Sequence, residues 1–133
     1  NIKKISFEEL LKISDIVSVH VPLSQETRGL FSAKEFGLMK KYSIFINTCR
    51  GPVHDEKSLI KALKSDQILG AALDVTEVEP ISKNSELLKL DNCVITPHLA
   101  GSSEESVDRR ILFAFENAKK TLNGIQPENL IFS

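Results

Sequence analysis

Several features that mark particular protein classes are scarce in this sequence. Its 133 residues include no tryptophan, one methionine, one tyrosine and two cysteines. Two cysteines, Cys49 and Cys93, do not make a disulfide framework, so a reduced intracellular setting is expected. No apolar run approaches the roughly 20 residues that cross a bilayer. The charged start at residues 1–4 is not a secretion signal, and we expect a cytoplasmic protein with no membrane partner.

Neither sign of charge is in excess. The chain has 17 Lys and Arg against 18 Asp and Glu, a formal net charge of −1. This balance argues against a nucleic-acid partner, which a strongly basic surface would attract. Apolar residues make up 41% and charged residues 26%, as in globular proteins. A chain of this length buries roughly two-thirds of its unfolded surface, so no metal is needed to hold the fold.

Four segments rich in β-branched and aliphatic residues alternate with segments of helical periodicity. The first kind predicts strands, at residues 15–22, 43–48, 68–75 and 93–96. Helices are predicted after capping side chains, which are Ser6 with Glu9, Ser32 with Glu35, Asp55, and Ser102 with Glu105. A short helical segment is expected at 86–90. This order predicts an α/β fold, a partial doubly wound (Rossmann-like) parallel sheet flanked by helices.

The apolar positions of the predicted helices indicate which sides face the core. In the first three helices these positions are Leu10, Leu11, Ile13, Phe36, Met39, Leu59, Ile60 and Leu63. The last helix, which ends at Asn123–Gly124, has one apolar side made of Val107, Ile111, Ala114, Phe115, Ala118 and Leu122. One apolar side per helix is what packing against a single sheet requires.

Polar and charged residues lie at the carboxyl end of every predicted strand or directly after it. The segments concerned are 20–22, 47–51, 74–79 and 96–98. In an open parallel sheet the ligand lies at the carboxyl ends of the strands. Prolines and glycines in these segments stiffen the loops and let a ligand approach the backbone. The sequence therefore predicts a binding site at this edge of the sheet.

Three side chains at this edge form a chemically coherent set. A guanidinium at Arg50 can bind a carboxylate and polarise a neighbouring carbonyl. The imidazole of His98 is suited to moving a proton near neutral pH, and a carboxylate at Glu79 would orient it. Asp74 could accept a hydrogen bond from an amide such as that of nicotinamide. The alternatives are a surface salt bridge for Arg50, a packing histidine, a solvated glutamate and an aspartate cap.

The same residues belong to blocks that resemble a known family, the NAD(P)-dependent D-isomer-specific 2-hydroxyacid dehydrogenases. The blocks, in order, are 14–23, 26–29, 46–51, 70–75, 79–80 and 96–101. The resemblance implies that Arg50, Glu79 and His98 are the catalytic set. It implies that the nicotinamide half of the cofactor site is lined by Val21, Pro22, Thr27, Thr48, Cys49, Arg50, Asp74, His98 and Gly101. The implied cofactor is NAD, with NADP open, and the implied substrate is a small 2-keto or 2-hydroxy acid.

The Cys49–Pro52 segment most resembles glyoxylate/hydroxypyruvate or phosphoglycerate-type members of that family. His20 and His54 lack the setting of His98 and are interpreted as packing or surface residues. An NAD-dependent enzyme is therefore the first hypothesis. The alternatives are a dehydrogenase-like module that senses NAD(H) and binds proteins, as corepressors do, and a shortened chain that assembles with another subunit.

The family's dinucleotide fingerprint, G-x-G-x-x-G, is missing from this sequence. The six glycines are at positions 29, 37, 51, 70, 101 and 124, and no two are two residues apart. We therefore expect residues 1–101 to be the C-terminal half of an NAD-binding domain. Residues 102–133 are expected to be a helix and tail that return to a substrate domain. The segment alone is expected to be inactive and to self-associate through an exposed sheet edge, and the full-length protein to be a homodimer.

Overall fold

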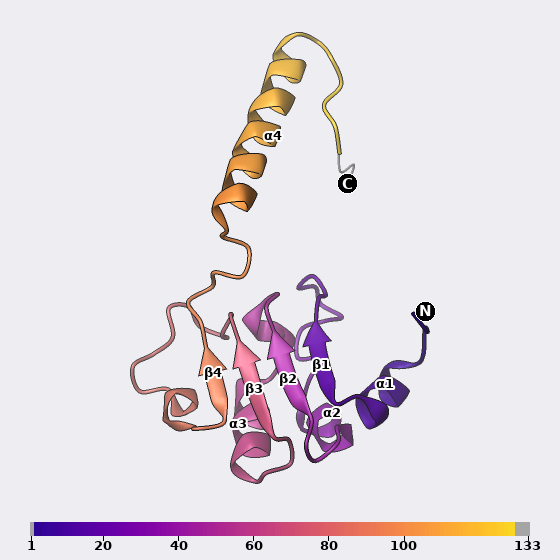
Figure 1. The fold of residues 1–133 in the computed structure, drawn as a ribbon, viewed down its shortest axis with the longest axis vertical. Coiled ribbons are helices and arrows are strands. Elements are labelled where there is room, and N and C mark those ends of the chain that lie inside the picture. The colour runs from indigo at the N-terminus through magenta and orange to yellow at the C-terminus, as the bar shows by residue number, and fades with distance from the viewer. Residues whose placement is uncertain (1, 130–133) are drawn as a thin grey trace. The chain divides into compact units, whose positions relative to one another are not determined.

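The computed structural model describes residues 2–129, which form two compact units divided between His98 and Leu99 (Figure 1). The helices and strands of the first unit are α1 (Phe7–Ile13), β1 (Ile16–Val19), α2 (Ala33–Leu38), β2 (Ile44–Asn47), η1 (Gly51–Val53), α3 (Glu56–Lys64), β3 (Gly70–Leu73), η2 (Glu86–Lys89) and β4 (Cys93–Ile95). The second unit contains α4 (Glu104–Leu122). Within residues 2–129, every helix is too short or too polar to traverse a lipid bilayer.

The four strands form one parallel sheet in the order β1-β2-β3-β4, which confirms the predicted α/β fold. Each strand is shorter than the segment predicted for it. β1 ends at Val19 because its partner β2 ends at Asn47, the residue paired with Val19. Beyond that point the chain has no ladder to join, and Pro22 has no N–H to offer one.

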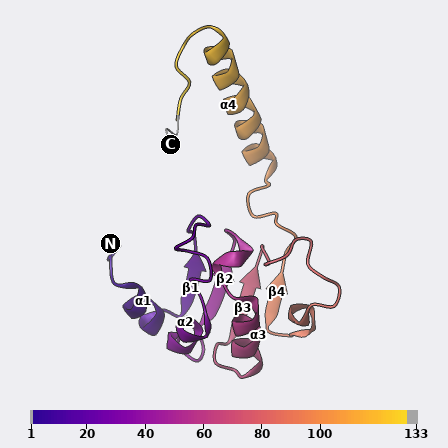
Figure 2. The same cartoon turned by 180° about the vertical axis from the view of Figure 1, so that it is seen from behind.

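The two faces of the sheet differ in what covers them. Val17, Phe45 and Leu73 lie on the covered face, where they share one core with residues of α2 and α3. Figures 1 and 2 show these helices against that face from opposite sides. On the other face Ile16 is 58% exposed and Val94 64% exposed. The sheet is therefore buried on one face within the described chain and open on the other.

A cluster of aromatic rings fills the core beneath β2. Phe45 lies 4.9 Å from Phe31 and 5.2 Å from Phe36 between ring centroids, and its third neighbour is the ring of His54 at 5.6 Å. All four side chains are at most 2% exposed. Edge-on and tilted ring pairs of this kind add stability beyond that of the buried area. His54 is thus part of the core, as the packing interpretation predicted.

Side-chain caps begin the helices of the first unit. Ser6 accepts the N–H of Glu9, Ser32 and Glu35 form a complete capping box, and Asp55 caps α3 through the N–H of Ser58. These confirm the predicted starts. At the first helix only the bond from the Glu9 N–H to Ser6 is present, so the predicted capping box there is half formed. The predicted inner faces were wrong at Ile13, the last residue of α1, which is 57% exposed. Leu10 and Ile60 are partly buried and pack against the core.

The second unit is a long amphipathic helix with a short return. The cap of α4 is Ser103, which accepts the N–H of Ser106, so the predicted cap at Ser102 was wrong by one residue. The predicted apolar side is present, but none of its residues is buried, and Leu122 is 89% exposed. Asn117 holds the return segment through two hydrogen bonds to the backbone of Glu128.

Candidate functional site

The parallel ladder places three strand ends side by side. The N–H of Asp74 donates to the carbonyl of Asn47 over 2.9 Å, and the N–H of Thr96 donates to the carbonyl of Leu73 over 2.9 Å. These bonds continue the pairing of β2 with β3 and of β3 with β4 by one residue. The side chains that follow the strands therefore meet at one edge, as the sequence predicted.

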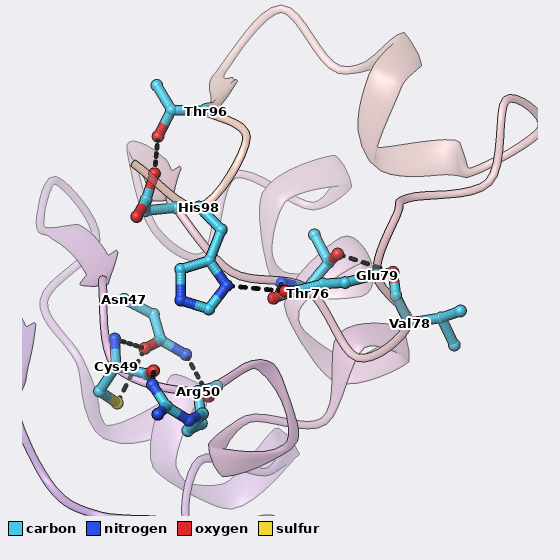
Figure 3. Close-up of polar contacts among 9 residues, drawn as sticks. Asn47, Cys49, Arg50, Thr76, Val78, Glu79, Thr96 and His98 are labelled. Carbon is cyan, nitrogen blue, oxygen red and sulfur yellow. Dashed lines mark hydrogen bonds and ion pairs between the residues drawn. The ribbon is translucent and has the colours of Figure 1, made fainter. Parts of the chain in front are cut away.

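His98 and Glu79 are in direct contact at this edge. Nδ1 of His98 donates to Oε2 of Glu79 over 2.7 Å, and the N–H of Thr76 donates to the other carboxylate oxygen over 3.1 Å (Figure 3). The bond from His98 is the main cause that lowers the pKa of Glu79, with the charge of Arg50 adding to it. Because an ionised carboxylate only accepts, Nδ1 carries the ring proton. Nε2 is then the atom that can exchange a proton with a ligand.

The backbone of His98 adopts a left-handed conformation, with φ of 55°. Its N–H donates to the carbonyl of Thr96 over 3.0 Å, which closes a tight turn around Pro97. Histidine is among the few non-glycine residues enriched in this region. Backbone strain of this type persists where the surrounding structure fixes it, and it is concentrated at functional sites.

Arg50 enters the site from the loop after β2. Its side chain is exposed, its Nη1 donates to the carbonyl of Cys49 over 2.6 Å, and its charge reaches Glu79. The next residue, Gly51, lies against the loop of Glu79. A Cβ at Gly51 would be 1.9 Å from the carbonyl oxygen of Thr76, so only glycine allows the two loops to touch.

Behind Arg50 lies a buried polar network that sequence reasoning missed. The amide of Asn47 donates to the carbonyl of Arg50 and to Nδ1 of His54, each over 3.0 Å. Its oxygen accepts the N–H and the thiol of Cys49, each over 3.0 Å. An asparagine and a histidine seven residues apart on either side of Arg50-Gly51-Pro52 were the available signal.

Asp74 is buried at the end of β3, and Thr96 donates to its Oδ1 over 2.5 Å. Asp74, Glu79 and His98 line one cleft of about 320 Å³. The apolar part of its wall comes from neighbouring side chains, which are Pro80, Ile81, Leu88, Ile95 and Pro97. A mostly apolar cleft with a few convergent polar groups is typical of a small-molecule site.

The loop after β1 lies at the same edge of the sheet, because β1 is parallel to β2. Thr27 donates to the carbonyl of Pro22 over 2.6 Å and accepts the N–H of Ser24 over 2.8 Å, so this loop is closed on itself. Val21 is partly buried against the core. Gly101 belongs to the second unit, where its carbonyl accepts from Arg110 over 3.1 Å, and its part in the site remains a prediction.

The polar and apolar groups at this edge suit the nicotinamide end of a dinucleotide. A buried carboxylate held by a hydroxyl can accept from a carboxamide, and the adjoining wall is apolar enough for an aromatic ring. Within residues 2–129 no three His, Cys, Asp or Glu side chains are placed to hold a metal ion. Cys49 and Cys93 are free thiols, both partly buried.

Comparison with known proteins gives a consistent result. The sequence model described as the NAD binding domain of D-isomer specific 2-hydroxyacid dehydrogenase matches residues 1–100. A glyoxylate reductase of Thermofilum pendens is 44% identical over 131 residues, 98% of this chain and 39% of the reductase. The chain thus spans about two-fifths of that relative.

Solved protein structures with a similar fold support the same family. The TT0316 protein from Thermus thermophilus superposes with a TM-score of 0.91 and 39% identity over 96% of this chain and 41% of that one. An acyclic imino acid reductase, Bsp5, in complex with NADPH and D-Arg superposes with a TM-score of 0.90 and 35% identity, over 98% of this chain and 41% of that one. The fold is therefore shared with a reductase whose structure contains NADPH.

Proposed function

Because the chain belongs to the D-isomer specific 2-hydroxyacid dehydrogenases, through their NAD-binding domain, we propose that its protein is an oxidoreductase of small 2-keto and 2-hydroxy acids. A bound NAD or NADP would supply or accept the hydride at C2 of the acid. The observation that carries the proposal is the 2.7 Å bond between His98 and Glu79 within the electrostatic reach of Arg50. Those three groups match the needs of a 2-keto acid: an anion to bind, a carbonyl to polarise and a proton to deliver.

His98 is the proposed acid and base. With Nδ1 bonded to Glu79, Nε2 delivers a proton to the carbonyl oxygen during reduction and recovers it during oxidation. Glu79 orients the ring by accepting from its Nδ1. Thr76 holds the second oxygen of Glu79, so the carboxylate presents a fixed edge to His98.

Arg50 is the proposed anchor of the substrate. Its guanidinium can bind the carboxylate of the acid through two N–H groups and also polarise the adjacent carbonyl. On the cofactor side, Asp74 would accept from the carboxamide, with Thr96 fixing its orientation. Val21, Pro22, Thr27, Thr48, Cys49 and Gly101 are proposed to line the nicotinamide half. Glyoxylate and hydroxypyruvate are the first substrates to test.

The proposal extends to the organisation of the protein. Residues 1–101 would act as the C-terminal half of the cofactor domain, and residues 102–133 as a helix and tail directed toward a substrate domain. None of the six glycines of this chain forms the glycine-rich motif that binds pyrophosphate. A homodimer is expected for the full-length protein, and sedimentation of the gene product that carries this sequence tests it.

Turnover by that gene product tests the activity. NADH or NADPH oxidation should follow addition of glyoxylate or hydroxypyruvate. His98→Asn should lower kcat on the order of 10²–10⁴-fold, and Arg50→Gln should raise the KM for the acid. Glu86→Gln is the control and should change neither value, because Glu86 is an exposed carboxylate of η2 that pairs with Lys64 of α3. Cofactor binding without turnover of any 2-keto acid would contradict the proposed oxidoreductase activity and identify a cofactor-sensing module.

A further inference from the structure

We propose that Asn47 is the positioning residue for Arg50, and that the buried ring of His54 holds Asn47 in the orientation this requires. The inference rests on the proposed role of Arg50 in binding the acid. It assigns a purpose to a buried polar pair that takes no part in the chemistry described above.

Both the nitrogen and the oxygen of the Asn47 amide make hydrogen bonds to the loop of Arg50. One N–H of this amide donates to the carbonyl of Arg50, and its oxygen accepts two bonds from Cys49 (Figure 3). The other N–H donates to His54. The side chain is completely buried. Backbone partners on both sides of the amide fix which end is oxygen and which is nitrogen. The 48–49 and 50–51 peptide groups are therefore tied to the last residue of β2.

His54 is built to accept the second N–H of that amide. Because Nδ2 of Asn47 is a donor, Nδ1 of His54 is the acceptor and the ring proton lies on Nε2. Nε2 is buried and makes no hydrogen bond within the described chain. The ring is held edge-on against Phe45, and the His54 backbone pairs with Phe31. The one polar contact of this ring is thus the bond to Asn47.

The position of the Arg50 guanidinium depends on the hydrogen bonds that Asn47 makes to this loop. Arg50 is exposed, and the contact that the structure gives its guanidinium is the carbonyl of the preceding residue, Cys49. Its place opposite Glu79 therefore follows from where the backbone at 49–51 lies. That backbone is fixed on one side by Asn47 and on the other by Gly51 against Thr76. Moving a substrate-binding group by about an ångström can lower the reaction rate by a factor on the order of a hundred.

The first experiment uses the gene product that carries this sequence and compares Asn47→Leu with Asn92→Leu. Asn92 also donates to a backbone carbonyl, that of Leu63, but at the opposite end of the sheet. Asn47→Leu should raise the KM for the 2-keto acid at least about tenfold, and by more than it raises the KM for the cofactor, whose nicotinamide half the same loop is proposed to line. A loss of folded protein alone would lower kcat and leave both KM values in place. Asn92→Leu should change neither KM.

The second experiment needs no activity. The Cys49 N–H donates to Asn47, so its hydrogen exchange should accelerate in Asn47→Leu while exchange in β3 stays slow. Unchanged exchange at Cys49, or unchanged KM for the acid in a variant set where Arg50→Gln raises it, overturns the inference. If Arg50→Gln itself leaves the KM unchanged, the proposed role of Arg50 fails, and the exchange result alone decides whether Asn47 holds the loop.

A matched pair at His54 covers the case in which Asn47→Leu does not fold. Asparagine and leucine are close in size, and asparagine keeps an acceptor near the position of Nδ1. Loss of Nε2 breaks no hydrogen bond in either variant. His54→Leu should raise the KM for the acid and accelerate exchange at Cys49, and His54→Asn should restore both toward wild-type values. Equal values for the two variants would contradict a role for the acceptor.

Discussion

Acidification is expected to destabilise the folded chain through His54. Burial lowers the pKa of this ring from 6.5 to about 4, and the nearby charge of Asp55 opposes the shift only in part. The folded state keeps the ring neutral while the unfolded state takes up a proton below about pH 6.5. The stabilising contribution is therefore complete above that pH and is lost as the pH falls from 6.5 toward 4.

The magnitude follows from the two pKa values. Between about pH 7.5 and about pH 5 the linkage relation gives a loss of about 2 kcal/mol from this one ring. Deeper acidification brings the total to roughly 3 kcal/mol, because both pKa values are then passed. Protonation at Nδ1 would also set an N–H against the N–H of Asn47 and break the hydrogen bond between the two side chains.

Urea unfolding at the two pH values measures this loss. The control is His54→Asn, which cannot titrate and keeps an acceptor. Carboxylates titrate in both proteins, so the difference between their pH dependences isolates the ring. Wild type should lose about 2 kcal/mol more than the variant. Equal losses within about 0.5 kcal/mol would refute the assignment of a buried neutral ring.

Three further outcomes are expected. Gly51→Ala should raise the KM for a 2-keto acid, because its Cβ would meet the carbonyl of Thr76 at 1.9 Å; an unchanged KM contradicts the close approach. Phe45→Ala should cost about 3–5 kcal/mol in urea unfolding, because the ring is completely buried among aromatic neighbours, and a loss below about 1.5 kcal/mol would contradict that packing. Burial raises the pKa of the Cys93 thiol to about 11, so in a Cys49→Ser background its reaction with a disulfide reagent near about pH 8 should be on the order of a hundredfold slower than in the unfolded chain. Equal rates would contradict its burial.

The sheet and the helix starts could be predicted because their signals are local. Strand composition and capping side chains act within a few residues, and Ser32 and Asp55 cap where expected. Strand ends are set by a partner elsewhere in the chain, which is why β1 stops at Val19. At the start of α4 two adjacent serines satisfy the same local rule, and the chain uses Ser103.

At the site, the sequence indicated which strand ends to examine but not what supports them. The contact of Glu79 with His98 was expected, since both follow strands of one parallel sheet. The contact of Asn47 with His54 was not expected, because an asparagine at the end of a strand is typical of the turn that follows and a histidine in an apolar segment is typical of packing. Their pairing depends on side-chain contacts across a turn, which periodicity does not encode.

The left-handed turn at His98 limits which substitutions can report on its chemistry. Most residues at a φ of 55° would push the turn toward another shape, and the loop would move together with the lost imidazole. Asparagine tolerates that region, so it removes the ring that we propose transfers the proton and keeps the turn. Alanine scanning, the usual first approach, would therefore overstate the contribution of the imidazole at this position.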